Sequence, residues 1–164
     1  MKYIVLCILV LITINAKSQP DMLSDKILEK ERVIDAEITQ LWNVLTNPSH
    51  IGQWLGIKTE SEWKKGSPIL FKFSWNEKDF IDKGVILAFE ENKKFSYSYW
   101  SSLSGLPDVE ENYSKITFDL QPDGNSTKLL LTHTHFATET MYEHSDKNWE
   151  ESLDTIKQLA ESGK

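Results

Sequence analysis

Residues 31–56 read ERVIDAEITQLWNVLTNPSHIGQWLG, and this stretch decides the fold. Its first part places apolar side chains at positions i, i+3, i+4 and i+7, the spacing of one face of an amphipathic helix. Asp35 stands where the N-cap of such a helix is expected. The residues that form the apolar face are Ile38, Leu41, Trp42 and Leu45.

A second short helix is predicted directly after the first. Asn47-Pro48 ends one helix and begins another, because proline lacks a donor N–H but suits a first helical turn. Trp54 belongs to the apolar face of this second helix, and Gly56 can adopt the positive φ that ends it. Two small helices that follow an opening strand at residues 26–34 need a large curved sheet to cover them.

In the rest of the chain, apolar and polar side chains alternate as in β-strands, and the last segment has the spacing of a helix. Polar or Gly/Pro-containing turns separate the predicted strands, and Gly84 opens one of them. We expect a last helix with an N-cap at or near Ser145 and an end at Gly163. Consecutive strands with helices at the ends predict an α+β fold with a curved antiparallel sheet wrapped around the long C-terminal helix. The predicted strands are residues 57–63, 69–74, 84–89, 95–99, 116–120 and 129–133; the apolar face of the helix is Trp149, Leu153, Ile156 and Ala160.

Several of these motifs resemble one known superfamily. The pattern WxxLTNP at residues 42–48, followed by WLG at residues 54–56, is similar to the opening of START-like (Bet v-like, SRPBCC) domains. Within them it looks like the branch homologous to the activator of heat-shock protein 90 ATPase. The resemblance covers roughly residue 26 to the C-terminus, and it implies the helix-grip fold with a cavity commonly kept between sheet and last helix. Further matching pieces are Gly84, FSYSYW at 95–100, residues 127–133, and Trp149 with Leu153.

Composition bounds the class of protein. A chain of 164 residues with 40% hydrophobic residues suits one folded domain with a sizeable core. We place this domain at residues 26–164. The net charge of −7 repels phosphate backbones, so no nucleic-acid partner is expected.

The first residues form a separate segment. Residues 1–18 carry Lys2 and then an apolar run of about 12 residues, shorter than the roughly 20 that cross a membrane. Ala16 and Ser18 are the small residues that a cut before Gln19 requires. We therefore expect a cleaved signal peptide rather than a membrane anchor, and no membrane span in the mature protein.

We make two predictions for the chain that remains after cleavage. Residues 19–25 are expected to be a disordered N-terminus. Cys7 is the only cysteine, so the mature domain would have neither a disulfide nor a thiol nucleophile. An exported domain without cysteines fits a bacterial periplasm or a secreted protein.

A histidine pair is the first candidate for chemistry. His133 and His135 are two residues apart on a predicted strand, so both imidazoles would share a face, as a metal site needs. Glu139, Glu143 and His144 could complete a ligand set. The alternative is that His133 is a core histidine hydrogen-bonded beside the last helix and that His135 lies near solvent. We favour this alternative and expect no metal and no cofactor.

An aromatic set is the second candidate. Aromatic side chains with a few polar groups could line a pocket between the sheet and the last helix, whereas the alternative is ordinary core packing. Trp54 and Leu55 could either line the mouth of such a pocket or seal it. The predicted cavity-lining residues are Trp54, Phe71, Phe73, Tyr97, Tyr99, Phe118, Leu131, His133, Trp149 and Leu153.

Catalytic motifs are few. The sequence contains no G-x-S-x-G and no Gly-rich phosphate loop. The acidic pairs Glu90-Glu91 and Glu110-Glu111 are typical of solvated turns, and Asp35 fits a helix cap better than a base. We therefore favour a non-enzymatic domain that binds a small hydrophobic or amphipathic molecule. The alternatives are a protein-interaction module of the co-chaperone type, with a protein partner, and a cyclase- or hydrolase-like enzyme that uses the same cavity.

Overall fold

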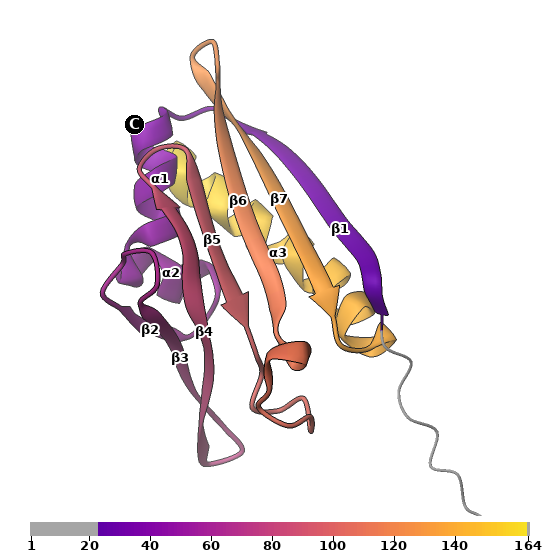
Figure 1. Cartoon of the computed structure of the whole chain (residues 1–164). Coiled ribbons are helices and arrows are strands. Elements are labelled where there is room, and N and C mark those ends of the chain that lie inside the picture. Colours follow the sequence, from indigo (N-terminus) through magenta and orange to yellow (C-terminus); the bar gives the residue numbers. More distant parts are fainter. Residues whose placement is uncertain (1–22, 164) are drawn as a thin grey trace, which may run out of the picture.

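A seven-stranded antiparallel sheet and three α-helices make up the computed structural model, which describes residues 23–163 (Figure 1). The strand order across the sheet is β1-β7-β6-β5-β4-β3-β2. The expected signal peptide at residues 1–18 lies outside the described residues. The elements are β1 (Leu23–Ile34), α1 (Ile38–Thr46), α2 (Pro48–Trp54), β2 (Lys58–Ser61), β3 (Pro68–Trp75), β4 (Lys78–Glu90), β5 (Lys94–Tyr99), the 3-10 helix η1 (Glu110–Asn112), β6 (Ser114–Asp123), β7 (Ser126–Phe136) and α3 (Glu139–Ser162).

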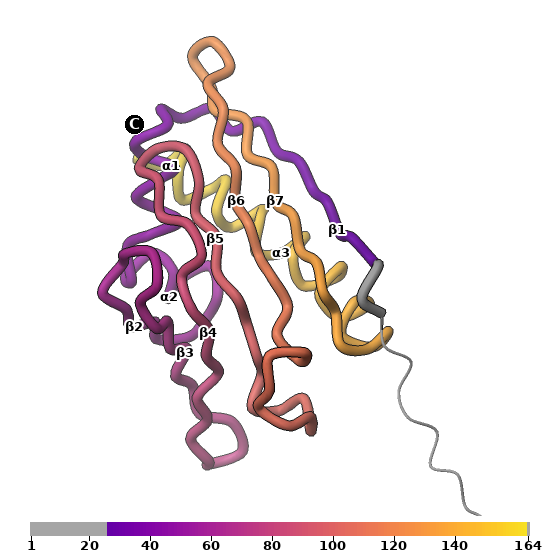
Figure 2. Tube along the Cα trace, viewed as in Figure 1, coloured from indigo at the N-terminus to yellow at the C-terminus, as the bar shows by residue number. Residues whose placement is uncertain are grey.

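The connection between the first two strands sets the topology. β1 and β2 occupy opposite edges of the sheet, and α1 and α2 carry the chain from one edge to the other. The remaining strands then follow one another as hairpins until β7 returns to pair with β1. Figure 2 shows the β3–β4 and β6–β7 turns at opposite ends of the sheet. The predicted α+β helix-grip fold, with two small helices after the first strand, is confirmed.

The cap of α1 differs from the sequence prediction. Glu37, not Asp35, is the N-cap, and its backbone N–H donates to Oε1 of Gln40 at 3.0 Å. The chain bends at residues 35–36 between strand and helix, so the helix begins later than Asp35 would allow. The backbone N–H of Asp35 instead donates to Oε1 of Glu161 near the end of α3, at 2.9 Å.

The break between α1 and α2 follows the prediction. Asn47 is the N-cap of α2, where its Oδ1 accepts from the N–H of Ser49 at 2.9 Å, and Pro48 occupies the first turn. Gly56, just after the helix, has φ +73°, a conformation that favours glycine.

The beginning of α3 corrects a second prediction. The helix begins at Glu139, where the N-cap Thr138 accepts from the N–H of Met141 at 3.2 Å, and so it starts well before Ser145. The first turns of α3 are mostly polar, and apolar periodicity gave no sign of them. The helix ends at Gly163 as predicted.

β4 is longer than the predicted strand, which began at Gly84. It begins at Lys78 and pairs with β3 through a two-residue turn, Asn76-Glu77, in which both residues have positive φ, as in tight hairpins. Gly84 lies inside the strand instead, where a Cβ would come within 1.6 Å of the carbonyl oxygen of Ser98. Glycine is therefore required by a close approach of two strands rather than by a turn.

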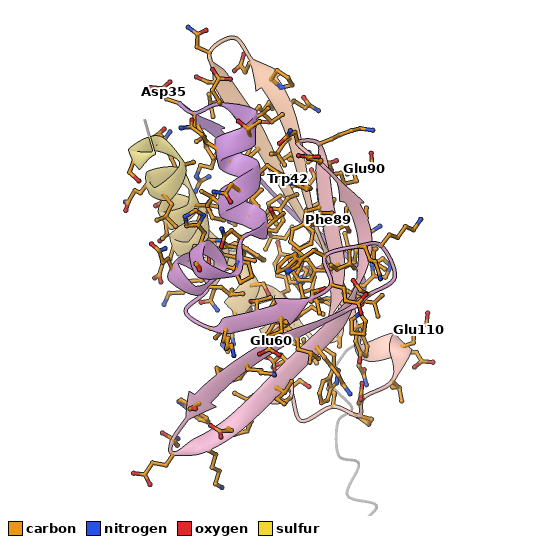
Figure 3. All side chains as sticks on the ribbon, turned by 90° about the vertical axis from the view of Figure 1, so that its left-hand side faces the viewer. Asp35, Trp42, Glu60, Phe89, Glu90 and Glu110 are labelled. Atoms are coloured by element: carbon orange, nitrogen blue, oxygen red, sulfur yellow. The ribbon has the colours of Figure 1, made fainter. Side chains whose placement is uncertain are left out.

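The core lies between the inner face of the sheet and the helices. Trp42 of α1 packs on Phe89 of β4 with ring centroids 5.1 Å apart (Figure 3). At the periphery, Glu90 at the end of β4 and Glu110 at the start of η1 are exposed, so both are solvated as predicted, although neither lies in a turn. The C-terminal end of α3 is joined to α1, because Nε2 of Gln40 donates to the carbonyl oxygen of Gly163 at 2.9 Å.

Candidate functional site

A cavity of about 140 Å³ lies between the sheet and the N-terminal half of α3. An apolar cavity of roughly 150 Å³ holds a benzene-sized molecule, whereas drug-sized ligands need roughly 300 Å³ or more. The cavity therefore fits a small molecule or one end of a longer one. Its walls are Phe71, Tyr97, Tyr99, Ile116 and His133 from the strands, Ser145, Asn148, Trp149 and Ser152 from α3, and Leu55 and Ile57 from the segment after α2.

Strand register builds the floor of the cavity. Tyr97 of β5 lies opposite Ile116 of β6, and Ile116 lies opposite His133 of β7. Residues that are opposite each other in an antiparallel sheet point to the same face. The three side chains thus form one row on the inner face, with a polar group on either side of Ile116.

His133 is fixed by α3. Nε1 of Trp149 donates to Nδ1 of His133 at 3.1 Å, which confirms the prediction of a core histidine bonded beside the last helix. Nε2 of His133 is buried and has no hydrogen-bond partner among the described residues. Burial lowers the pKa of this imidazole to about 3, so the ring is neutral at physiological pH.

The two tyrosines of the wall differ in their partners. The hydroxyl of Tyr99 donates to Oδ2 of Asp82 at 2.5 Å, and Oδ1 of Asp82 accepts from both the N–H and the hydroxyl of Ser102 at 2.7 Å. The Tyr97 hydroxyl makes no hydrogen bond within residues 23–163. Burial raises the pKa of Tyr97, and burial together with the charge of Asp82 raises that of Tyr99, so both stay protonated.

Small side chains on α3 leave the space. Ser145 and Ser152 stand four residues before and three residues after Trp149, positions on the same helical face. Neither serine fills the volume that a leucine would occupy there. Asn148 is exposed, so the wall of the cavity reaches the surface of the molecule at this point.

Half of the ten predicted lining residues meet at the cavity: Phe71, Tyr97, Tyr99, His133 and Trp149. Four others are buried in the neighbouring core. Trp54, one of them, donates from Nε1 to the carbonyl oxygen of Val44 at 3.0 Å and packs against Trp149. Phe73 lies apart, stacked on Phe80 of the β3–β4 hairpin with centroids 5.7 Å apart. The buried four are Trp54, Phe118, Leu131 and Leu153.

Sequence reasoning missed five of the lining residues. The helical period relative to Trp149 could have found Ser145 and Ser152. Pairing with Tyr97 and His133 could have found Ile116, but register was not known from sequence. The other two are Ile57 and Asn148, whereas Leu55, considered for the mouth together with Trp54, does line the cavity.

The two histidines considered for a metal site, His133 and His135, lie in different environments. His135 is exposed, has φ +60°, and contacts Oγ1 of Thr134 through Nδ1 at 2.8 Å, while His133 is buried. The positive φ breaks the strand alternation, so the two imidazoles do not share an environment. Within residues 23–163, no group of three or more His, Cys, Asp or Glu side chains could hold a metal ion.

The chain belongs to a known family. The curved sheet that wraps a C-terminal helix defines a START-like domain. The family model described as "Activator of Hsp90 ATPase homolog 1-like protein" matches residues 35–161, so the chain is a member of that family. A comparison with curated proteins gave no match. No helix of the described part is both long and apolar enough to span a bilayer.

Solved structures agree with this assignment. ChR145 from Cytophaga hutchinsonii is 36% identical, with a TM-score of 0.75 over 87% of this chain and 98% of that one. Protein MLL2253 from Mesorhizobium loti is 25% identical, with a TM-score of 0.68 over 82% and 96%. The Aha1 dimer from Colwellia psychrerythraea is 20% identical, with a TM-score of 0.66 over 85% and 98%, and shares the fold.

Proposed function

We propose that this chain is an exported, non-catalytic binding protein that holds a small hydrophobic or amphipathic molecule in the cavity beneath α3. The observation that carries the proposal is the cavity itself: about 140 Å³, with aromatic and aliphatic walls. None of its lining residues carries a charge at neutral pH, since His133 is neutral. Apolar walls with a few polar groups are the usual make-up of a small-molecule site.

Tryptophan fluorescence tests this proposal. Trp149 is part of the wall, and Trp54 lies beside it with ring centroids 6.3 Å apart. Titration of the purified chain with small aromatic probes and with single-chain lipids is expected to give a saturable change in emission. Ser152→Phe should fill the cavity and abolish that change.

The control is the same substitution elsewhere on α3. Ser162 is exposed near the end of the helix, so Ser162→Phe should bind the probes as the unaltered chain does. Binding that survives Ser152→Phe would place the probe elsewhere and contradict the proposal.

The low pKa of His133 favours a binding role over a catalytic one. A general base works best when its pKa lies near the working pH. The pKa of His133 is lowered to about 3, which makes it a poor base. An enzyme of the cyclase or hydrolase type would lose turnover in His133→Ala while its melting temperature stayed near that of the parent chain.

A protein-binding role is the second candidate, because the family's description names an activator of an ATPase. A protein exported by its leader would not meet a cytosolic chaperone, which counts against that particular activity. Export is tested by mass spectrometry of the N-terminus: we expect it at Gln19 in the envelope or medium, and an intact Met1 in the cytosol would contradict export. If a pull-down from an envelope extract returned no saturable protein partner, the second candidate function would be ruled out.

A further inference from the structure

The hydroxyl of Tyr97 is a polar group that is reached only from the cavity. It makes no hydrogen bond within residues 23–163. In that part of the chain, the buried side-chain atoms that lack both a partner and accessible surface are Oγ1 of Thr59, Oδ1 of Asn92 and Nε2 of His133. The Tyr97 oxygen is not one of them, so it keeps accessible surface. Because Tyr97 is only 3% exposed and is part of the cavity wall, this surface faces the cavity.

The other polar groups of the wall are already satisfied, sealed or open to water. Nδ1 of His133 accepts from Trp149, and its Nε2 is closed off inside the core. Tyr99 donates its proton to Asp82. The polar residues that α3 contributes are half-buried or exposed, so bulk water reaches them: Ser145, Asn148 and Ser152.

The neighbours of Tyr97 do not satisfy its hydroxyl. The rings of Phe71 and Phe95 have their centroids 5.5 and 5.2 Å from that of Tyr97, and Ile116 lies opposite it on β6. None of these side chains has a polar atom. A water is held firmly in a cavity by roughly two to four polar partners, so one bound beside Tyr97 would be displaced readily. The hydroxyl therefore costs the unliganded chain stability, whereas phenylalanine would fill the same space without that cost.

The chemistry of this hydroxyl defines the group that would complement it. Burial raises the pKa of Tyr97, so the hydroxyl stays protonated and is able to donate. A phenol donates more strongly than it accepts, because its lone pairs are partly delocalised into the ring. No lining residue is charged, so an ionised ligand would be buried without a partner. The complementary group is a neutral acceptor oxygen.

We propose that Tyr97 determines the specificity of the cavity, which takes a small cyclic ketone of about benzene width whose carbonyl oxygen accepts a hydrogen bond from the Tyr97 hydroxyl. This inference rests on the proposed function, because it names the chemical class that the same cavity holds. The aromatic and aliphatic walls supply the remaining affinity.

A pair of isosteric probes measures the hydrogen bond. Cyclohexanone and methylenecyclohexane differ only in that C=O replaces C=CH₂. Each is titrated by NMR at pH 7 into the unaltered chain and into Tyr97→Phe. The measured quantity is the dissociation constant of methylenecyclohexane divided by that of cyclohexanone, so the difference in hydrophobicity between the probes cancels when the two chains are compared. We expect this ratio to fall at least about tenfold in Tyr97→Phe, because the buried ketone loses its donor.

The control is the same substitution outside the cavity. The hydroxyl of Tyr113 donates to Asp108 at 2.6 Å on the exposed surface, so Tyr113→Phe should leave the ratio unchanged. An unchanged ratio in Tyr97→Phe, or an equal fall in Tyr113→Phe, would overturn the proposal. Infrared spectroscopy of bound cyclohexanone gives a second readout. The carbonyl stretch should lie at lower frequency in the unaltered chain than in Tyr97→Phe, and equal frequencies would also overturn the proposal.

The stability of Tyr97→Phe tests the uncommitted state of the hydroxyl. The variant should melt at the temperature of the unaltered chain or above it, and a clear loss of stability would show that the hydroxyl is already bonded within the chain, which would overturn the inference.

The titrations also separate the two proposals. Binding of both probes with a ratio that does not depend on Tyr97 would overturn the ketone specificity and leave the cavity function standing. Failure of both probes to bind the unaltered chain would overturn the cavity function, and this inference with it.

Discussion

The two halves of α3 pack against the sheet in different ways. In the C-terminal half, Leu153, Ile156 and Ala160 are fully buried. In the N-terminal half, Ser145 and Ser152 flank Trp149, and a cavity occupies the space beside them. The difference shows that one continuous helix can be buried core at one end and the wall of a cavity at the other, through the size of the side chains on a single face.

Polar contacts help to hold the N-terminal half of α3, beside the packing of Trp149 and Tyr142 on aromatic rings. Lys30 of β1 donates to Asp146 at 2.7 Å and to Glu150 at 2.5 Å, and Arg32 also pairs with Glu150. Inside, the Trp149–His133 hydrogen bond links helix and sheet. Directional contacts of this kind fix the position of α3 without filling the space beneath it.

The largest expected effect is at the solid end. Leu153→Ala removes a fully buried side chain and should lower the free energy of unfolding by about 2–5 kcal/mol. Urea denaturation measures it. Leu159→Ala, on the same helix but only half-buried, is the control and should cost clearly less. Equal losses would mean that the C-terminal half is not solid core.

The wall of the hollow end depends on Tyr99. Tyr99→Phe leaves Asp82 without one of its hydrogen-bond donors, and we expect a loss of about 1.5–3 kcal/mol in the free energy of unfolding. Tyr113→Phe is a matched control, because its hydroxyl donates to Asp108 at 2.6 Å on the exposed surface. If the control were as costly, burial of Asp82 would not be the cause.

The pH dependence of stability reports on His133. Its pKa is lowered to about 3 in the folded chain, against about 6.5 in the unfolded chain, so the unfolded state binds more protons as pH falls below 6.5. Stability should therefore be full above about pH 7.5 and be lower by about 2 kcal/mol at pH 5.

Two features isolate this effect. Glu60, Glu150 and Glu161 have pKa values lowered by hydrogen bonds to lysines, and their stabilisation is lost only at more acidic pH, below their unfolded pKa of about 4.5. Chemical denaturation of His133→Gln should show a flat profile between pH 6.5 and 5. A slope that persists in this variant would refute the assignment.

The smallest expected effect on stability is at the serines. Ser145→Leu completes the apolar face of α3 and should change the free energy of unfolding by less than about 1 kcal/mol, while it reduces probe affinity at least about tenfold. Ser162→Leu, outside the cavity, should leave affinity unchanged. If binding were lost although NMR showed that the new side chain does not enter the cavity, the filled-cavity explanation would be wrong.

Much of the fold could be predicted because it is encoded locally. The alternation of Phe95, Tyr97 and Tyr99 and the helical spacing from Trp149 to Ala160 gave strands and helix in the right order. Errors arose where local signals are silent. The first turns of α3 are polar, and the role of Gly84 depends on Ser98 of another strand.

The candidate site could be predicted from the sequence less completely than the fold. Aromatic type alone could not separate Phe71, which lines the cavity, from Phe118, which is buried in the core. Both are buried phenylalanines on strands of alternating pattern, and only the tertiary structure shows that Phe71 borders the cavity whereas Phe118 packs on Phe95 and Trp149.

The sequence by itself determined the α+β architecture, the break at Asn47-Pro48 and the identity of the buried helix face, because hydrophobic period and backbone preference act between near neighbours. Only the tertiary structure decided that Ser145 and Ser152 would line a cavity, and that Trp149 would donate a hydrogen bond to His133. Volume and hydrogen-bond partners between two layers depend on strand register and helix position, which join residues far apart in the chain.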